Sequence, residues 1–170
     1  TGVMRAFVTV GVERMPFNRL VNAVDEGVRQ GILSPESVMQ TGHTPCPPTR
    51  CQWTKFLSFD EMVRHIREAD IVICHAGVGS VLLCHELGRV PLIMPRKGSL
   101  GEHVDNHQRD FADVMNTEGV AIAVHDGETM LSLLTQVPDV LLQKRPANGN
   151  TNTLAENLGT IIRELAPKRS

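Results

Sequence analysis

Residues 70–80 read DIVICHAGVGS, and this stretch decides the fold. Its first half, DIVIC, is a continuous apolar run of the kind that forms a strand in a parallel sheet covered on both faces. A glycine turn follows, and a helix is then predicted over 80–87, ending at Gly88. A buried strand, a short turn and a helix are the beginning of a strand–helix–strand crossover, which joins parallel strands.

The same alternation of strand and helix continues on both sides of this stretch. It predicts an α/β fold with a doubly wound, Rossmann-like parallel sheet. Because the crossovers are right-handed, the carboxyl ends of all strands meet at one edge of the sheet, where we expect the ligand site. Further strands are predicted over 5–10, 37–41, 55–57, 90–95 and 120–124, and further helices over 16–28, 58–68, 104–115 and 127–134.

The chain divides into one predicted domain and a carboxy-terminal extension. Residues 1–137 contain all the predicted strands and are assigned to the α/β domain, and residues 138–152, rich in Pro and Asn, are a predicted linker. Residues 153–170 are predicted to contain an amphipathic helix, because apolar residues recur there every three or four positions. This apolar stripe either folds back on the domain or docks on a partner.

Composition is that of a soluble globular protein. The chain has 170 residues, of which 41% are hydrophobic and 21% charged, so it can bury a core. The formal net charge of −2 argues against a general polyanion binder, and no nucleic-acid partner is expected. No apolar run approaches the roughly 20 residues of a membrane span, and the start of the chain lacks the apolar stretch of a secretory signal. We therefore expect a cytoplasmic location.

The glycine turn at residues 75–80 is the first candidate binding element. Gly77 and Gly79 would let a ligand approach the backbone, and the free amides at the start of the following helix suit a diphosphate. Ser80 adds a hydroxyl, and His75 adds a donor that becomes cationic when protonated. The alternative is a turn that serves only tight packing between strand and helix.

Two later groups of polar residues are predicted at the same edge of the sheet. Arg96 and Lys97 directly follow the strand at 90–95, where they would meet an anion or be solvated as surface charges. Residues 102–108 gather hydrogen-bonding side chains at the start of a helix. Some are ordinary helix-capping types, but carboxamides, a carboxylate and imidazoles also suit the hydroxyls of a sugar.

A metal site is not predicted. His103 and His107 stand four residues apart, which would place two imidazoles on one helix face. No third ligand accompanies them, and the chain has no Asp-x-Asp motif of the kind that holds a metal on nucleotide sugars. We therefore expect neither a metal nor another cofactor.

Several motifs follow one another along the chain, namely His75-Ala76-Gly77-x-Gly79-Ser80, Pro91-Leu92-Ile93-x-Pro95-Arg96, Leu100-Gly101-Glu102-His103 and Asn106-His107-Gln108. In this order they resemble the carboxy-terminal domain of glycosyltransferase family 28, in its small stand-alone form. That form includes the catalytic subunit of the eukaryotic two-part N-acetylglucosaminyltransferase that acts on dolichol-linked sugar. The stretch from Pro95 to Gln108 looks closer still to bacterial counterparts in exopolysaccharide assembly, which are often glucuronosyltransferases.

The resemblance implies half of a GT-B fold that binds a UDP-sugar, with a separate membrane-anchored subunit that binds a lipid-linked saccharide acceptor. It also implies inverting transfer without a metal, in which an acceptor hydroxyl displaces UDP. The protein would then lie at the inner face of the membrane, held there by its partner.

The motifs and the resemblance together assign residue roles. The glycine turn would meet the diphosphate, and His107 and Gln108 would hold the donor sugar. The predicted catalytic residues are His75, His103 and Asp105. The predicted substrate-binding residues are Gly11, Gly77, Val78, Gly79, Ser80, Glu86, Arg96, Glu102, Asn106, His107 and Gln108.

Two positions depart from the family pattern. Many relatives carry a glutamate that grips the ribose in the middle of the helix after the glycine turn, and Leu83 stands at that position. Glu86, one turn further on, either takes over the ribose or lies on the surface. Relatives often have a threonine after the first glycine, where this chain has Val12 and then Glu13, so Glu13 faces either the acceptor or solvent.

The predicted function is the UDP-sugar-binding catalytic subunit of a two-component inverting glycosyltransferase. Glucuronic acid is the favoured donor sugar, because Arg96 and Lys97 would pair with its carboxylate and the closest-looking relatives use it. The general base comes either from the partner or from His103, Asp105 or Glu13. The alternatives are a non-catalytic nucleotide-sugar sensor or assembly factor, and an epimerase-like enzyme acting on nucleotide sugars.

Overall fold

The structure, a computed structural model, describes residues 3–136. The predicted linker at 138–152 and the predicted helix at 153–170 lie outside the described residues. The elements, in chain order, are β1 (Ala6–Thr9), α1 (Asn18–Arg29), β2 (Val38–Gln40), β3 (Gln52–Thr54), α2 (Phe59–Glu68), β4 (Ile71–His75), α3 (Val78–Glu86), β5 (Leu92–Met94), the short 3-10 turn η1 (Gly98–Leu100), α4 (His107–Thr117), β6 (Ile122–Ala123) and α5 (Gly127–Gln136).

The strands form one six-stranded parallel sheet in the order β3-β2-β1-β4-β5-β6. In the centre of the sheet Val8 of β1 lies beside Met39 of β2 and Ile73 of β4. The chain winds outward from β1 in one direction and, after crossing to β4, in the other. The carboxyl ends of β1 and β4 therefore flank the switch point at which ligands bind in open α/β sheets.

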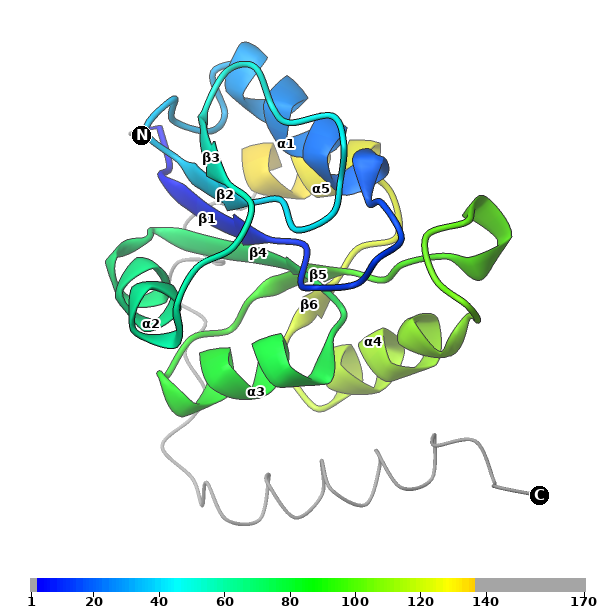
Figure 1. The fold of residues 1–170 in the computed structure, drawn as a ribbon. Coiled ribbons are helices and arrows are strands. Elements are labelled where there is room, and N and C mark those ends of the chain that lie inside the picture. Colours follow the sequence, from blue (N-terminus) through cyan, green and yellow to red (C-terminus); the bar gives the residue numbers. More distant parts are fainter. Residues whose placement is uncertain (1–2, 137–170) are drawn as a thin grey trace, which may run out of the picture.

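Helices cover both faces of the sheet, with α1 and α5 on one side and α2, α3 and α4 on the other (Figure 1). Successive side chains of a strand point to opposite faces, which connects each strand to both layers. Val8 packs in a cluster that includes Leu20 of α1 and Met130 of α5. Phe7, its neighbour, packs with Ile66 of α2 instead. The predicted Rossmann-like α/β fold is confirmed.

Most element boundaries lie within two residues of the sequence prediction, and the two elements that differ by three residues at a boundary each have a local cause. The strand expected over 55–57 is β3, three residues earlier, because residues 52–54 are the ones that pair with β2. The apolar residues that suggested a strand there instead follow its end. The helix expected from residue 104 begins at His107, because side chains of the preceding turn bond backbone N–H groups in a non-helical arrangement.

The start of helix α2 is specified by its local sequence. Ser58 caps it by accepting a hydrogen bond from the backbone N–H of Glu61, and the Glu61 carboxylate accepts one from the N–H of Ser58. This capping box fixes the turn between β3 and α2.

No helix within residues 3–136 has the length and apolar character that crossing a membrane requires.

Candidate functional site

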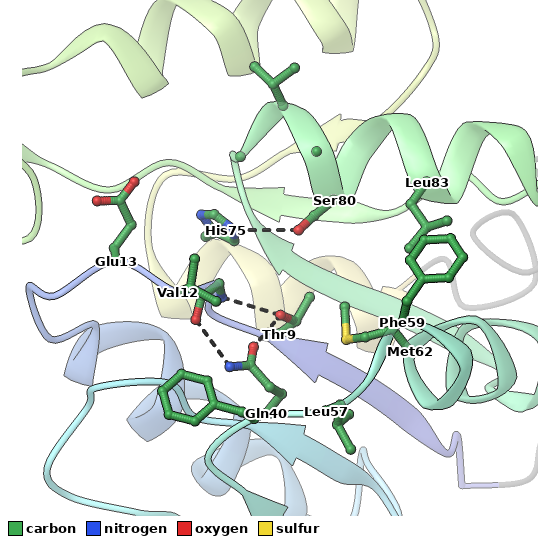
Figure 2. Close-up of a pocket in the computed structure, with 15 residues that line it drawn as sticks. Thr9, Val12, Glu13, Gln40, Leu57, Phe59, Met62, His75, Ser80 and Leu83 are labelled. Carbon is green, nitrogen blue, oxygen red and sulfur yellow. Dashed lines mark hydrogen bonds between the residues drawn. The ribbon is translucent and has the colours of Figure 1, made fainter.

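A pocket of about 490 Å³ opens at the carboxyl ends of β1 and β4, at the switch point of the sheet (Figure 2). The loops after β1, β3 and β4 contribute to its lining, together with α2 and α3. Polar groups of β1, β4 and the start of α3 lie on one side. On the other side Leu57, Phe59, Met62 and Leu83, which we call the apolar wall, face the same space.

His75, the last residue of β4, is the central polar side chain of the pocket. It is only 6% exposed, and its Nε2 lies 3.5 Å from the hydroxyl of Ser80. Its Nδ1 has no hydrogen-bond partner. Two glycines make room for the ring, because a Cβ on Gly11 would lie 2.4 Å from Nε2 and one on Gly77 would lie 2.2 Å from Cε1. Gly77 has an ordinary extended backbone (φ −89°), so its value here lies in the missing Cβ.

His75 does not carry the positive charge that a protonated imidazole would offer a phosphate. Burial, together with the nearby charges of Arg96 and His103, lowers the pKa of His75 to about 3. The low-dielectric site disfavours the charged ring, and a neighbouring cation disfavours it further. His75 is therefore neutral near pH 7 and offers a ligand one N–H donor rather than a positive charge.

The start of α3 is open toward the pocket. Gly77 is the N-cap residue, so no side chain caps the helix, and no acidic residue lies in its first turn. The first N–H groups of a helix have no partner within it, and its dipole makes this end positive. Gly79 has open space where a Cβ would stand, so a ligand can approach the backbone there. The expected diphosphate-binding residues Gly77, Val78, Gly79 and Ser80 all line the pocket.

The floor of the pocket is held by a side-chain network that sequence reasoning did not assign to the site. Gln40 accepts a hydrogen bond from the Thr9 hydroxyl and donates to the carbonyls of Gly11 and Lys55. The N–H of Gly11 donates to Thr9 in turn. Gly42 lets its own backbone approach the loop at Gly11, because a Cβ on residue 42 would lie 2.4 Å from the Gly11 carbonyl oxygen. The network fixes the position of Gly11, which lines the pocket as expected.

The apolar wall was also missed, and the structure favours the surface alternative for Glu86. Phe59 is 68% exposed although it is the first residue of α2. Because residues 55–57 were read as a strand, the loop that carries Leu57 into the pocket was not recognised. Glu86, expected to meet a ribose, is exposed at the last position of α3 and does not line the pocket, whereas Leu83 does.

Arg96 does not serve as a ligand-binding cation. Its side chain is fully buried and donates to the carbonyls of Val10 (2.6 Å), Met15 (2.7 Å) and Glu102 (3.0 Å). The guanidinium also lies 4.8 Å from the centre of the Phe17 ring. Its two terminal nitrogens already join the loops after β1 and β5, and its Nε is buried without a hydrogen-bond partner, so the structure contradicts the expected pairing with a donor carboxylate.

Three other expected binding residues hold the loop between β5 and α4 together. Glu102 is buried, pairs with Arg19 at 3.1 Å and accepts from the N–H of Lys97. Gln108 accepts from the N–H of Arg96, and Asn106 accepts from the N–H of Gly98. The side-chain oxygens of Glu102, Gln108 and Asn106 therefore have partners within the chain. Their occurrence in the sequence is explained by these bonds and does not require a bound sugar. His107 is exposed and is not part of the pocket lining.

His103 and Asp105 form a link from this loop to the pocket. Nδ1 of His103 lies 3.2 Å from a carboxylate oxygen of Asp105, and its Nε2 lies 3.4 Å from a carboxylate oxygen of Glu13. Glu13 in turn lines the pocket. Within residues 3–136 no cluster of three or more His, Cys, Asp or Glu side chains could hold a metal ion.

Comparison with known proteins agrees with this architecture. Residues 5–162 match the family described as Glycosyltransferase family 28 C-terminal domain. No curated protein matches the chain. Among solved structures, the NMR solution structure of ALG13 is 21% identical with a TM-score of 0.58, and the match covers 92% of this chain and 95% of that one.

Two larger proteins contain the same fold as part of their chains. The crystal structure of the glycotransferase of kitacinnamycin is 15% identical with a TM-score of 0.57, and the match covers 96% of this chain and 39% of that one. For MurG from Acinetobacter baumannii the identity is 19%, the TM-score 0.54, and the coverage 85% and 42%. The chain thus spans about two fifths of these two proteins. At these identities the likeness establishes the fold, which resembles one half of a GT-B glycosyltransferase.

Proposed function

The chain belongs to the glycosyltransferase family 28 C-terminal domain family, and from this premise we propose that it is the UDP-sugar-binding subunit of an inverting glycosyltransferase. Membership gives it a role in sugar transfer. One observation carries the assignment of the donor: the uncapped start of α3 and the neutral, buried His75 face a pocket that has an apolar wall. Free amides suit a diphosphate, and an apolar wall suits a nucleobase.

The proposed chemistry uses the start of α3 to stabilise the leaving group. As the acceptor hydroxyl attacks the anomeric carbon, the bond to the diphosphate breaks and negative charge grows on UDP. Preorganised N–H groups directed at that charge lower the activation barrier, because they are already in place and need no reorganisation energy during the reaction. The buried His75 would add one further donor. In this proposal neither a metal nor another cofactor takes part.

Glu13 is the residue that we propose takes the proton from the acceptor hydroxyl. It lines the pocket, and its carboxylate lies 3.4 Å from Nε2 of His103. Asp105 lies on the other side of the same imidazole. Two carboxylates that flank an imidazole fix its orientation, so His103 and Asp105 would position Glu13. A base at this point would lie on the side of the pocket away from the apolar wall.

The partner and the sugar are proposals that follow from the family. We infer a membrane-anchored subunit that binds a lipid-linked saccharide and holds this protein at the cytoplasmic face of the membrane. The proposed donor sugar is glucuronic acid, on the resemblance of residues 95–108; Arg96 is excluded as the cation for its carboxylate, and Lys97 is not among the described residues that line the pocket. In a competition assay with the assembled enzyme, UDP-glucuronate should outcompete UDP-N-acetylglucosamine, and the reverse order would reject this sugar.

Calorimetric titration with UDP, GDP and ADP tests the donor site itself. We expect UDP to bind most tightly and His75→Gln to weaken it by tenfold or more, because the variant disturbs the groups at the start of α3. His125→Gln is the matched control, since His125 pairs with Asp113 outside the pocket. Absence of binding by all three nucleotides would contradict the proposed function.

A further inference from the structure

The two sides of the pocket differ in what they offer a nucleoside. The apolar wall presents only carbon and the sulfur of Met62, and Phe59 is left 68% exposed beside it. A large exposed aromatic side chain at the mouth of a pocket is a surface on which a flat ring stacks. A nucleotide with its diphosphate at the start of α3 would place its base and the adjoining face of its ribose against this wall.

Helical geometry places Leu83 next to the ribose of a ligand bound in this way. Ser80 and Leu83 are three residues apart on α3 and both line the pocket, so they share one face of the helix. Leu83 lies roughly 4.5 Å further along the axis, at about 1.5 Å per residue. If the diphosphate lies at the start of α3, this spacing brings Leu83 to the ribose attached to the diphosphate. The side chain that meets the ribose at this point has no hydrogen-bonding group.

Gln40 and Thr9 are engaged within the pocket floor, and the other polar side chains of the pocket lie away from the apolar wall. Gln40 and Thr9 bond to each other and to the backbone of the pocket floor. Ser80 lies beside His75 at the start of α3, and Glu13 contacts His103 on the far side from the apolar wall. Among the described lining residues, none offers a free polar side chain along the wall to a ribose hydroxyl.

We propose that this donor site does not read the 2′-hydroxyl of the nucleotide, so that 2′-deoxyuridine diphosphate binds as well as UDP and thymidine diphosphate binds at least as well as 2′-deoxyuridine diphosphate. The inference rests on the proposed function and extends it to the class of donor. A site discriminates strongly for a hydroxyl only when buried polar groups are left unpaired in its absence. The 5-methyl group of thymine would instead gain contact with apolar surface, worth roughly fourfold in affinity if it is fully buried.

Calorimetry on the unmodified protein with UDP, dUDP and dTDP separates the two effects. UDP and dUDP differ only at the 2′ position, and dUDP and dTDP only at the base methyl. We expect dUDP to bind within about threefold of UDP, and dTDP to equal or exceed dUDP by up to roughly fourfold. A preference of tenfold or more for UDP over dUDP would overturn the inference while leaving the proposed function intact. Absence of binding by all three would overturn both.

A variant makes the position of the ribose testable. Leu83→Gln introduces a hydrogen-bonding group at the wall, and we expect the ratio of UDP to dUDP affinity to rise at least fivefold. Leu82→Gln is the matched control, because Leu82 is also partly buried on α3 but does not line the pocket. If Leu83→Gln proves unstable in a thermal melt, Met62→Gln tests the same wall from α2. An unchanged ratio in a folded variant that still binds UDP would contradict the assignment.

Discussion

Two regions at the same edge of the sheet are both rich in polar residues, yet they differ in whether those residues have partners. At the start of α3 the helix is uncapped, and Nδ1 of His75 has no partner. In the loop at residues 96–108, Arg96 and Glu102 bond to groups of the chain itself. Although Nε of Arg96 is also without a partner, it is buried inside the chain, so this difference supports the proposed binding site at the start of α3 rather than in the loop.

The loop at residues 96–108 yields the largest expected effect. Arg96→Met should lower the free energy of unfolding by about 4 kcal/mol, because it leaves the buried carbonyls of Val10, Met15 and Glu102 without a donor. Urea unfolding of the purified variant measures this loss. Lys97→Met is the control, with an expected change of less than about 0.5 kcal/mol for a more exposed neighbour. Equal effects of the two substitutions would show that Arg96 is not a structural residue.

The pH dependence of stability should reveal the neutral His75. Its pKa is about 3 in the folded protein and near the ordinary histidine value of 6.5 in the unfolded chain. Between these values the unfolded chain binds a proton that the folded chain does not. Lowering the pH from 6 to 4.5 should therefore cost about 1.4 kcal/mol of stability per pH unit from this residue.

Comparison with His75→Gln isolates that contribution. The variant cannot take up the proton, so its stability should fall less steeply across the same range, as measured by urea unfolding at a series of pH values. Parallel curves for the two proteins would mean that His75 titrates at similar pH in the folded and unfolded states. That result would place water around the ring, in disagreement with its burial.

A smaller effect is expected for the glycines beside His75. Gly77→Ala should cost about 2 kcal/mol and weaken UDP binding tenfold or more, because the added methyl overlaps the imidazole ring. Gly79→Ala meets no atom within 4 Å and improves helix propensity, so stability should be unchanged or rise by up to about 1 kcal/mol. Differential scanning calorimetry and UDP titration of the pair measure both. Similar losses of stability in the two variants would contradict the packing role of Gly77.

Glu13 should affect turnover far more than binding. Glu13→Gln keeps the size of the side chain but cannot accept a proton, so we expect UDP affinity to change less than about twofold. The rate of UDP release with acceptor and partner present should fall at least a hundredfold, within the usual range for loss of a general base. Asp105→Asn, which reaches Glu13 through His103 and also alters the acceptor of the His107 N–H, should shift the pH profile of that rate with a smaller loss. Full activity of Glu13→Gln would exclude Glu13 as the base and leave the partner, His103 or Asp105.

The sequence predicted the fold and the glycine turn, because both depend on local patterns. Apolar runs mark the buried strands, and a strand followed by a glycine turn and a helix identifies the ligand edge of the sheet. The roles of Arg96 and Glu102 could not be obtained in this way. Their partners, such as Val10 and Arg19, lie far away in the chain, and a sequence does not state which charges have partners.

The apolar wall was missed for a different reason. Phe56 and Leu57 have the composition of a strand, but β3 ends before them and they lie at the pocket. The residue at which β3 ends is set only by its pairing register with β2. Burial of His75 between two glycines is likewise a tertiary feature, and it is the main reason that the imidazole is neutral.

The central claim is that the start of α3, and not the loop at residues 96–108, receives the diphosphate. Backbone amide chemical shifts recorded by NMR with and without saturating UDP test it directly. The account predicts the largest changes at the amides of Val78, Gly79 and Ser80, with small changes at residues 102–108. The largest changes at residues 102–108, with those of α3 unmoved, would contradict it.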